Sequence, residues 1–203
     1  MRNIWQEIIN LIDGADVDVV INKGDAAIGD KICRDLNIPS ESVLYSVVSN
    51  SNGIVVNHWI RILGQDSSEN NGVYYYNSKY TGKISKMFLV ANDIVGGLFA
   101  ISIDKFEDKN FIWYFAPDTL EWECLNMQYN EFIAWCFKGN VDEFYASMRW
   151  KNWKEDVKDV GMNNAILIYP FLWAKECDIE SATKKEVAID EIIEMNFEYS
   201  RRV

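Results

Sequence analysis

Apolar residues recur at a helical period at the start of the chain, which predicts helices there. Over residues 2–12 they lie three and four apart, and Gly14 follows as a stop. Residues 17–21 form a short extended segment in this interpretation. A second helix is expected after Gly24 and before Pro39, because three apolar residues lie four apart and would share one face. These residues are Ile28, Ile32 and Leu36.

The period then shortens to two, which is typical of strands. Residues 43–49 and 53–63 flank Asn52-Gly53, and an Asn-Gly pair between two apolar runs predicts a hairpin. The polar segment 65–82 is expected to be a long excursion that holds a short helix. Further strands are predicted in the segments KMFLVAND, GGLFAISID and FIWYFA, the last as a central strand covered on both faces.

The segment Leu120–Leu125 alternates strictly between apolar and acidic residues. Trp122 and Cys124 should therefore be buried, and Glu121 and Glu123 exposed, on a strand with one wet face.

Helical spacing returns after this strand. Five apolar positions over residues 129–137 define one helix face, and Gly139 should end that helix in the left-handed conformation. Asn140 should cap the next helix, with Glu143 completing a capping box. A helix is expected over residues 150–160, a buried strand broken at Pro170 over 165–174, and a last helix over 186–198.

The order of elements predicts an α+β fold with a mainly antiparallel sheet flanked by helices at both ends of the chain. We expect one domain over residues 1–203. It divides into N-terminal helices at 1–40, the sheet at 43–125 with the polar excursion, and C-terminal helices at 126–203.

Composition narrows the classes of function. The 203 residues are 49% apolar, and 31 acids against 20 bases give a net charge of −11. This balance argues against nucleic acids and anionic membrane surfaces as partners. Residues 102–203 carry 20 acids and 12 bases, hence −8 of the total. The N-terminus lacks the continuous apolar run of a signal peptide, so we expect a cytoplasmic protein.

The residue types of metal and cofactor sites are sparse and scattered. No two of the four cysteines have C-x-x-C spacing, and His58 is the single histidine. We therefore expect no structural metal and no cofactor, with the thiols free in a reducing compartment. No phosphate-binding loop is present. The cysteines are Cys33, Cys124, Cys136 and Cys177.

Candidate catalytic groups are equally few. A hydrolase triad would need His58, but its place in an apolar strand favours a structural role. Gly96 and Gly97 follow Asp93 at a turn between two strands, where glycine permits backbone conformations that other residues avoid. An enzyme or small-ligand protein that uses Asp93, Asp118 and His58 remains an alternative.

Surface groups suited to binding a protein are more numerous. Most of the eight tryptophans must be core, but Trp150 and Trp153 lie among charges and could anchor an interface. The partner-binding hypothesis combines these two residues with the exposed acids Glu121, Glu123, Asp142 and Glu143. A self-associating structural protein is a further alternative.

Several segments also resemble a known family. GIVVNHWIRILG, FLVANDIVGGLFAI, FIWYFAPDTLEWECL, YNEFIAWCFKGNVDEFYASMRWKNW and IYPFLWAKE, in this order, resemble domain-of-unknown-function family 2625. That family looks related to the SUKH superfamily, which has the Smi/Knr-like fold. The most specific pieces are Ala116–Trp122 and Tyr169–Trp173. The turn that begins at Asp93 and the following Phe-x-x-Phe helix are shared more loosely with SUKH proteins.

The resemblance implies a fold and a type of function. It implies an α+β domain and a protein-binding role without catalytic residues. SUKH proteins include immunity proteins that neutralise toxins of bacterial competition systems, and regulatory scaffolds. A basic toxin would suit the acidic charge of this chain, because opposite charge accelerates association.

Overall fold

The computed structural model describes residues 3–105 and 109–202, and it confirms the predicted α+β fold. Seven strands form one antiparallel sheet in the order of the chain, from β1 to β7, and two more form a separate antiparallel pair. The strands are β1 Val19–Lys23, β2 Ser51–Val56, β3 Ile60–Ile62, β4 Met87–Asp93, β5 Leu98–Ser102, β6 Phe111–Phe115, β7 Trp122–Gln128, β8 Asn164–Tyr169 and β9 Thr183–Ala188.

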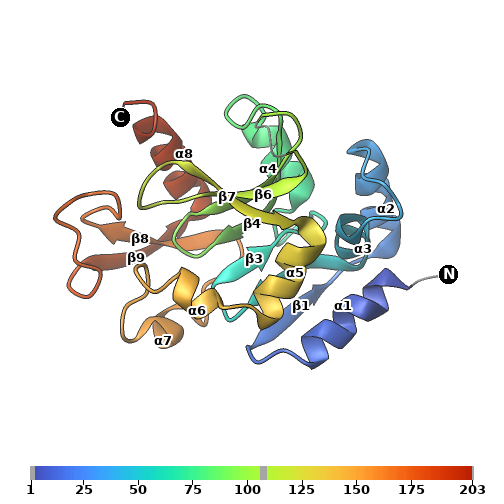
Figure 1. Ribbon diagram of the computed structural model, residues 1–203, viewed down its shortest axis with the longest axis horizontal. Helices are drawn as coiled ribbons and strands as arrows, with labels where there is room; N and C mark the ends of the chain where they lie inside the picture. The colour runs from blue at the N-terminus through green and yellow to red at the C-terminus, as the bar shows by residue number, and fades with distance from the viewer. Residues whose placement is uncertain (1–2, 106–108, 203) are drawn as a thin grey trace.

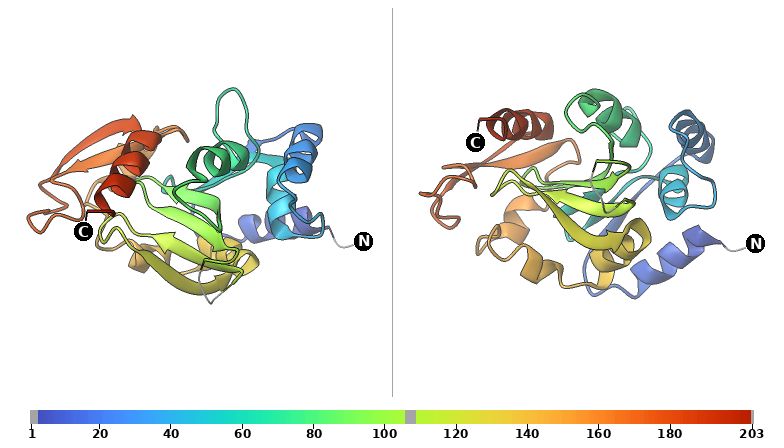
Figure 2. Two further views of the ribbon diagram at one scale, coloured as in Figure 1. Left: turned by 90° about the horizontal axis from the view of Figure 1, so that it is seen from above. Right: turned by 45° about the horizontal axis from the view of Figure 1, so that its top comes forward.

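Helices cover both faces of the large sheet. In Figure 1, and in the right view of Figure 2, α4 and α8 lie on one side of it, with α1, α5 and α6 on the other. Within the described ranges, no helix is long and apolar enough to cross a membrane. The helices are α1 Ile4–Asp13, α2 Ala26–Asp35, α3 Val43–Asn50, α4 Val73–Tyr80, α5 Tyr129–Lys138, α6 Val141–Phe144, α7 Trp153–Val157 and α8 Ile189–Tyr199.

The strand register decides which sheet residues meet which helices. Phe99 and Tyr114 are paired across β5 and β6, and Phe99 packs on Phe132 of α5. Phe115 belongs to the opposite face, because successive strand residues alternate, and it packs on Phe197 of α8. The sheet therefore has two buried faces.

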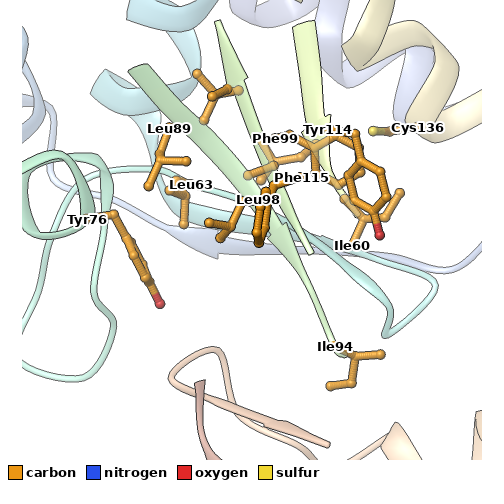
Figure 3. Close-up of a cluster of buried hydrophobic side chains, with 14 of the residues drawn as sticks. Ile60, Leu63, Tyr76, Leu89, Ile94, Leu98, Phe99, Tyr114, Phe115 and Cys136 are labelled. Carbon is orange, nitrogen blue, oxygen red and sulfur yellow. The ribbon is translucent and has the colours of Figure 1, made fainter. Parts of the chain in front are cut away.

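Figure 3 shows part of the resulting core, in which side chains from β3 to β6 and from α4 gather. The Phe99 and Tyr114 rings lie 4.7 Å apart between centroids. The stripe predicted on residues 129–137 is confirmed, because all five of its apolar residues are buried in α5. They are Tyr129, Phe132, Ile133, Cys136 and Phe137.

The hairpin predicted around Asn52-Gly53 is wrong. Residues 43–50 form helix α3, whose cap Ser42 accepts a hydrogen bond from the Tyr45 backbone N–H. The β-branched residues of this segment tolerate the helix because it is enclosed by the core on several sides. The hairpin joins β2 to β3 instead, and Asn57 and His58 turn with φ of 51° and 53°. His58 is therefore a turn residue and not a strand residue.

The division of the chain into helical ends and a central sheet is also too simple. β1 lies within residues 1–40, and β8 and β9 lie within 126–203. Strand β9 was not predicted, so the last helix begins at Ile189 and not at 186. The strand predicted over 165–174 is confirmed as β8 as far as Tyr169, but residues 171–174 form no strand, and the short helix expected within 65–82 is confirmed as α4.

Smaller corrections concern single positions in helices. Gly139 ends α5 with extended backbone, so its conformation is not left-handed. The Asn140 side chain donates to the Glu143 carboxylate and caps no backbone N–H. Ile28 is 50% exposed, because Gly29 and Cys33 are the buried residues of α2. Only residues 153–157 of the helix predicted at 150–160 are helical.

Candidate functional site

The turn between β4 and β5 is organised by a fully buried carboxylate. One oxygen of Asp93 accepts hydrogen bonds from the backbone N–H groups of Val95 and Gly97, at 3.0 and 2.8 Å. The other oxygen accepts from the hydroxyls of Tyr114 and Tyr145, at 2.7 and 3.1 Å. Burial raises the pKa of Asp93, although these four donors oppose the effect. The arrangement holds the turn in place and leaves Asp93 no exposed surface.

Gly96 and Gly97 have different reasons to be glycine. Gly96 has a φ of 92°, and a Cβ there would lie 2.4 Å from the Ile192 side chain of α8. A Cβ on Gly97 would lie 2.2 Å from the Asp93 carboxylate. The turn thus fits closely between Asp93 and α8.

The three residues of the enzymatic alternative do not form a common site. The four donors to Asp93 come from neither His58 nor Asp118. His58 instead lies 2.9 Å from the Asp18 carboxylate, and its side chain is one-third exposed. Asp118 lies in the loop before β7. Among the described residues, no group of three His, Cys, Asp or Glu is placed to hold a metal ion.

The acids of the partner-binding hypothesis lie around β7, the last strand of the sheet. Glu121 and Glu123 are exposed there, and Trp122 and Cys124 are half-buried and not buried as expected. The alternation is as predicted, but an edge strand receives cover from one neighbour only. The segment FIWYFA, which was predicted to be a central strand, forms β6 instead. This strand is next to the edge of the sheet.

Asp142, Trp150 and Trp153 contact other side chains of this protein. The Arg149 guanidinium donates to the exposed Asp142 carboxylate, and its carbon Cζ lies 4.0 Å from the centre of the Trp153 ring. Trp150 is 4% exposed, and its indole N–H donates to Asp156 at 2.6 Å. Trp150 is therefore part of the core, and Trp153 is half-buried against Arg149.

A pocket joins the acidic strand to the helix that carries Glu143. It is a shallow pocket of about 400 Å³, open to solvent, between β7, α5 and α6. Its floor is apolar and half-buried, and Glu143 and Asn140 lie on its exposed rim. The apolar residues of the lining are Cys124, Leu125, Met127, Trp135 and Phe144.

Sequence reasoning missed this pocket, although one signal was available. Trp135 falls beside the buried stripe of α5, where a large aromatic residue has to be covered by something else. In the structure it meets Phe144 of α6 at 5.2 Å between ring centroids, edge to face. Larger cavities, of about 470 and 550 Å³, lie elsewhere, beside the starts of α1 and α3, and are lined by none of the predicted site residues.

The electrostatics of the edge favour a positively charged ligand. Within the described part of the chain, Glu121, Glu123 and Glu143 form no ion pair with a lysine or arginine. Three carboxylates thus lie around one edge of the sheet without an ion-pair partner among the described residues, and the Lys105 ammonium lies near them, 5.5 Å from the centre of the Trp122 ring.

Two bacterial proteins are similar in sequence to this chain. It is 30% identical over 204 aligned positions to an uncharacterized protein of Haemophilus influenzae, a match that spans 97% of this chain and 90% of the relative. It is 40% identical over 110 positions to the uncharacterized protein YbfG of Escherichia coli, a match that spans 54% of this chain and half the length of that relative. Residues 2–192 match the model of one family. The chain therefore belongs to the family described as protein of unknown function DUF2625.

Proposed function

We propose that this protein is a non-catalytic binding protein that recognises a basic protein partner through the acidic edge, defined as Glu121, Glu123 and Glu143. The observation that carries the proposal is the absence of a basic ion-pair partner for these three carboxylates among the described residues. A partner that supplies lysine or arginine would neutralise them, and the attraction would raise its rate of association.

The resemblance to SUKH proteins supports two biological forms of this function. In the first, the protein is an immunity protein, and the basic partner is a toxin. In the second, it is a regulatory scaffold that holds a basic segment of another protein. Both forms use the same acidic edge in the reducing cytoplasm, and both need no cofactor.

The test compares two variants with the same change of net charge. One replaces Glu121 and Glu123 by Lys, and the control replaces Asp13 and Asp16 by Lys. The control residues are exposed and lie near the opposite edge of the sheet, where Asp13 is the last residue of α1 and Asp16 lies in the loop before β1. Partners are captured from the native organism with the wild-type protein, and association is then followed with each purified partner.

We expect the edge variant to associate much more slowly than the control, and salt to slow the wild type toward the rate of the edge variant. The dissociation rate should change less. Equal association rates for the edge variant and the control would show that net charge, and not the acidic edge, attracts the partner. Turnover of a metabolite at a mutable site near Asp93 would contradict the non-catalytic proposal.

A further inference from the structure

Resting on this proposed function, we propose that an extended, arginine-bearing segment of the partner adds to the sheet as a strand beside β7. One of its arginine side chains enters the pocket between β7, α5 and α6. The inference specifies how the partner binds and which side chain the pocket selects.

The free edge of β7 provides the backbone contacts. β7 is last in the strand order, so within the described residues it pairs with β6 only. The left view of Figure 2 shows it at the outer margin of the large sheet. An exposed strand edge has unpaired N–H and C=O groups, and extended peptides bind such edges by strand addition.

Irregular geometry limits where an added strand can pair. Trp122, Glu123 and Cys124 have regular partners on β6, but the register shifts beyond Cys124, and Asn126 has a φ of 53°. A bulge of this kind bends the strand and interrupts its edge. The added strand should therefore lie along residues 121–125, which is the part that carries the two exposed glutamates.

The pocket lies directly beside this part of β7. Cys124 and Leu125 belong to its wall, and Trp135 and Phe144 form its aromatic floor. Side chains of an added strand alternate between its two faces, so those on the α6 side would point toward this pocket. Pockets for alternate side chains give specificity in strand addition, whereas the backbone gives affinity.

The chemistry of the pocket matches arginine better than other side chains. The aliphatic stem would cover the apolar floor, and the planar guanidinium can stack on an aromatic ring. Glu143 on the rim can accept two parallel hydrogen bonds from the guanidinium. Glu123 lies on the same face of the sheet, because it is paired with Tyr114, whose ring contacts Phe144.

A second copy of this chain is a poor occupant. Two β7 edges placed together would bring Glu121 and Glu123 of one copy against the same glutamates of the other. Like charges in facing strands are destabilising. The same residues that discourage self-pairing attract a basic strand, and this commits the proposal to a partner of opposite charge.

Cys124 offers a readout of strand addition. It is paired with Trp113, so its side chain points to the face of the sheet opposite to Tyr114 and Glu123. It is half-buried there, whereas Cys33 and Cys136 are buried. In the variant Cys177→Ser it is the only cysteine of the described residues that is more than slightly accessible. The rate at which a thiol reagent modifies Cys124 therefore reports whether an added strand covers the edge of β7.

The probe is a synthetic peptide that alternates threonine and arginine, added to Cys177→Ser. Two matched peptides test its parts. One replaces each arginine by citrulline, which has the same shape without the charge, and one carries N-methyl groups on alternate backbone amides, which block strand pairing. We expect the parent peptide to slow modification about tenfold at roughly ten times its Kd. Both matched peptides should protect much less.

A second variant tests the carboxylate on the rim. Glu143→Gln is an exposed, nearly isosteric change that should leave the fold intact. It should weaken the arginine peptide about tenfold, as expected for the loss of a charge-assisted contact, and leave the citrulline peptide unchanged.

Each outcome separates the inference from the proposed function. Equal protection by the N-methylated peptide would contradict strand addition, and equal protection by the citrulline peptide would contradict selection of arginine. If the native partner is lost in the Glu121→Lys/Glu123→Lys variant but neither it nor the peptide protects Cys124, the acidic edge binds its partner in another way. The proposed function would then survive, and the inference would fail.

Discussion

At the scale of single residues, the buried charged side chains Asp93 and Arg149 have different kinds of partner. Asp93 accepts hydrogen bonds from two backbone N–H groups and two tyrosines. The Arg149 side chain is 6% exposed and lies among aromatic rings, with Asp142 as its one carboxylate partner. Burial raises the pKa of Asp93 and lowers the pKa of Arg149, so both side chains lose part of their usual preference for the charged form.

Asp93 should make stability depend on pH. Because burial raises its pKa above the ordinary 3.8 in the folded state, its contribution is fully present below the unfolded pKa and is lost as pH rises through the folded pKa. Asp93→Asn mimics the protonated form. We expect the unfolding free energy of the wild type, measured with urea, to fall relative to that of Asp93→Asn as pH rises above about 4. If the unfolding free energy of the wild type instead rises relative to that of Asp93→Asn as pH rises, the four hydrogen-bond donors lower the pKa of Asp93 by more than burial raises it.

Arg149 should stabilise the protein mainly through its aromatic contacts. Arg149→Ala removes the guanidinium from the rings of Trp59 and Trp153 and should cost about 2 kcal/mol or more. The matched change Asp142→Asn keeps those contacts and should cost less than about 1 kcal/mol, because the Asp142 side chain is 72% exposed. Urea unfolding measures both. Equal losses of unfolding free energy in the two variants would mean that Arg149 stabilises the protein through its ion pair with Asp142.

At the scale of elements, helix α8 is held to α4 by a shared carboxylate. Asp190 accepts hydrogen bonds from the hydroxyls of Tyr75 and Tyr80, both at 2.5 Å, and forms an ion pair with Lys79 at 2.9 Å. The same lysine also reaches Glu194, one turn further along α8. Five side chains thus connect α4 to the helix that covers one face of the sheet.

Asp190→Asn should loosen this connection. We expect a loss of about 1.5–3 kcal/mol in the free energy of unfolding, because charge-assisted hydrogen bonds are lost from a side chain that is only 21% exposed. Glu194→Gln is the control, since it also removes a carboxylate from Lys79 but at a half-exposed position, and it should cost under about 1 kcal/mol. If the control costs as much, the tyrosines contribute little.

An element can be predicted from the sequence where the spacing of its apolar residues matches the way in which the element packs. The α5 stripe was predictable because five apolar residues at helical spacing face one core. Helix α3 was not predictable, since its β-branched residues favour strands. Only its burial and the Ser42 cap stabilise the helical conformation. At the site, the exposure of Glu121 and Glu123 follows from alternation. The pocket does not, because it depends on the irregular register of β7 and on how α6 meets Trp135.

At the scale of the whole molecule, charge is concentrated where the proposed binding surface lies. Residues 102–203 hold −8 of the net −11, and all three residues of the acidic edge belong to this half. The opposite edge, at β1, belongs to the less charged half. A partner would therefore be oriented by charge before it touches the protein.

The molecule should fold without a structural metal. Its cysteines are spread over four different regions of the chain, and a core of this extent needs no metal to be stable. We expect elemental analysis of purified, dialysed protein to find less than stoichiometric zinc, and a chelator to leave the urea unfolding curve unchanged. Zinc that survives dialysis, together with unfolding on chelation, would contradict this prediction.

The strictly sequential order of the large sheet has a consequence for how the chain acquires its structure. Each strand from β1 to β7 pairs with its neighbour in the chain, so the sheet can grow stepwise from the N-terminal side during synthesis. Helix α8, which covers Phe115, follows much later. The part of the sheet face that α8 covers therefore stays exposed until residues 189–199 emerge from the ribosome. We expect the nascent protein to be most prone to aggregation during this interval.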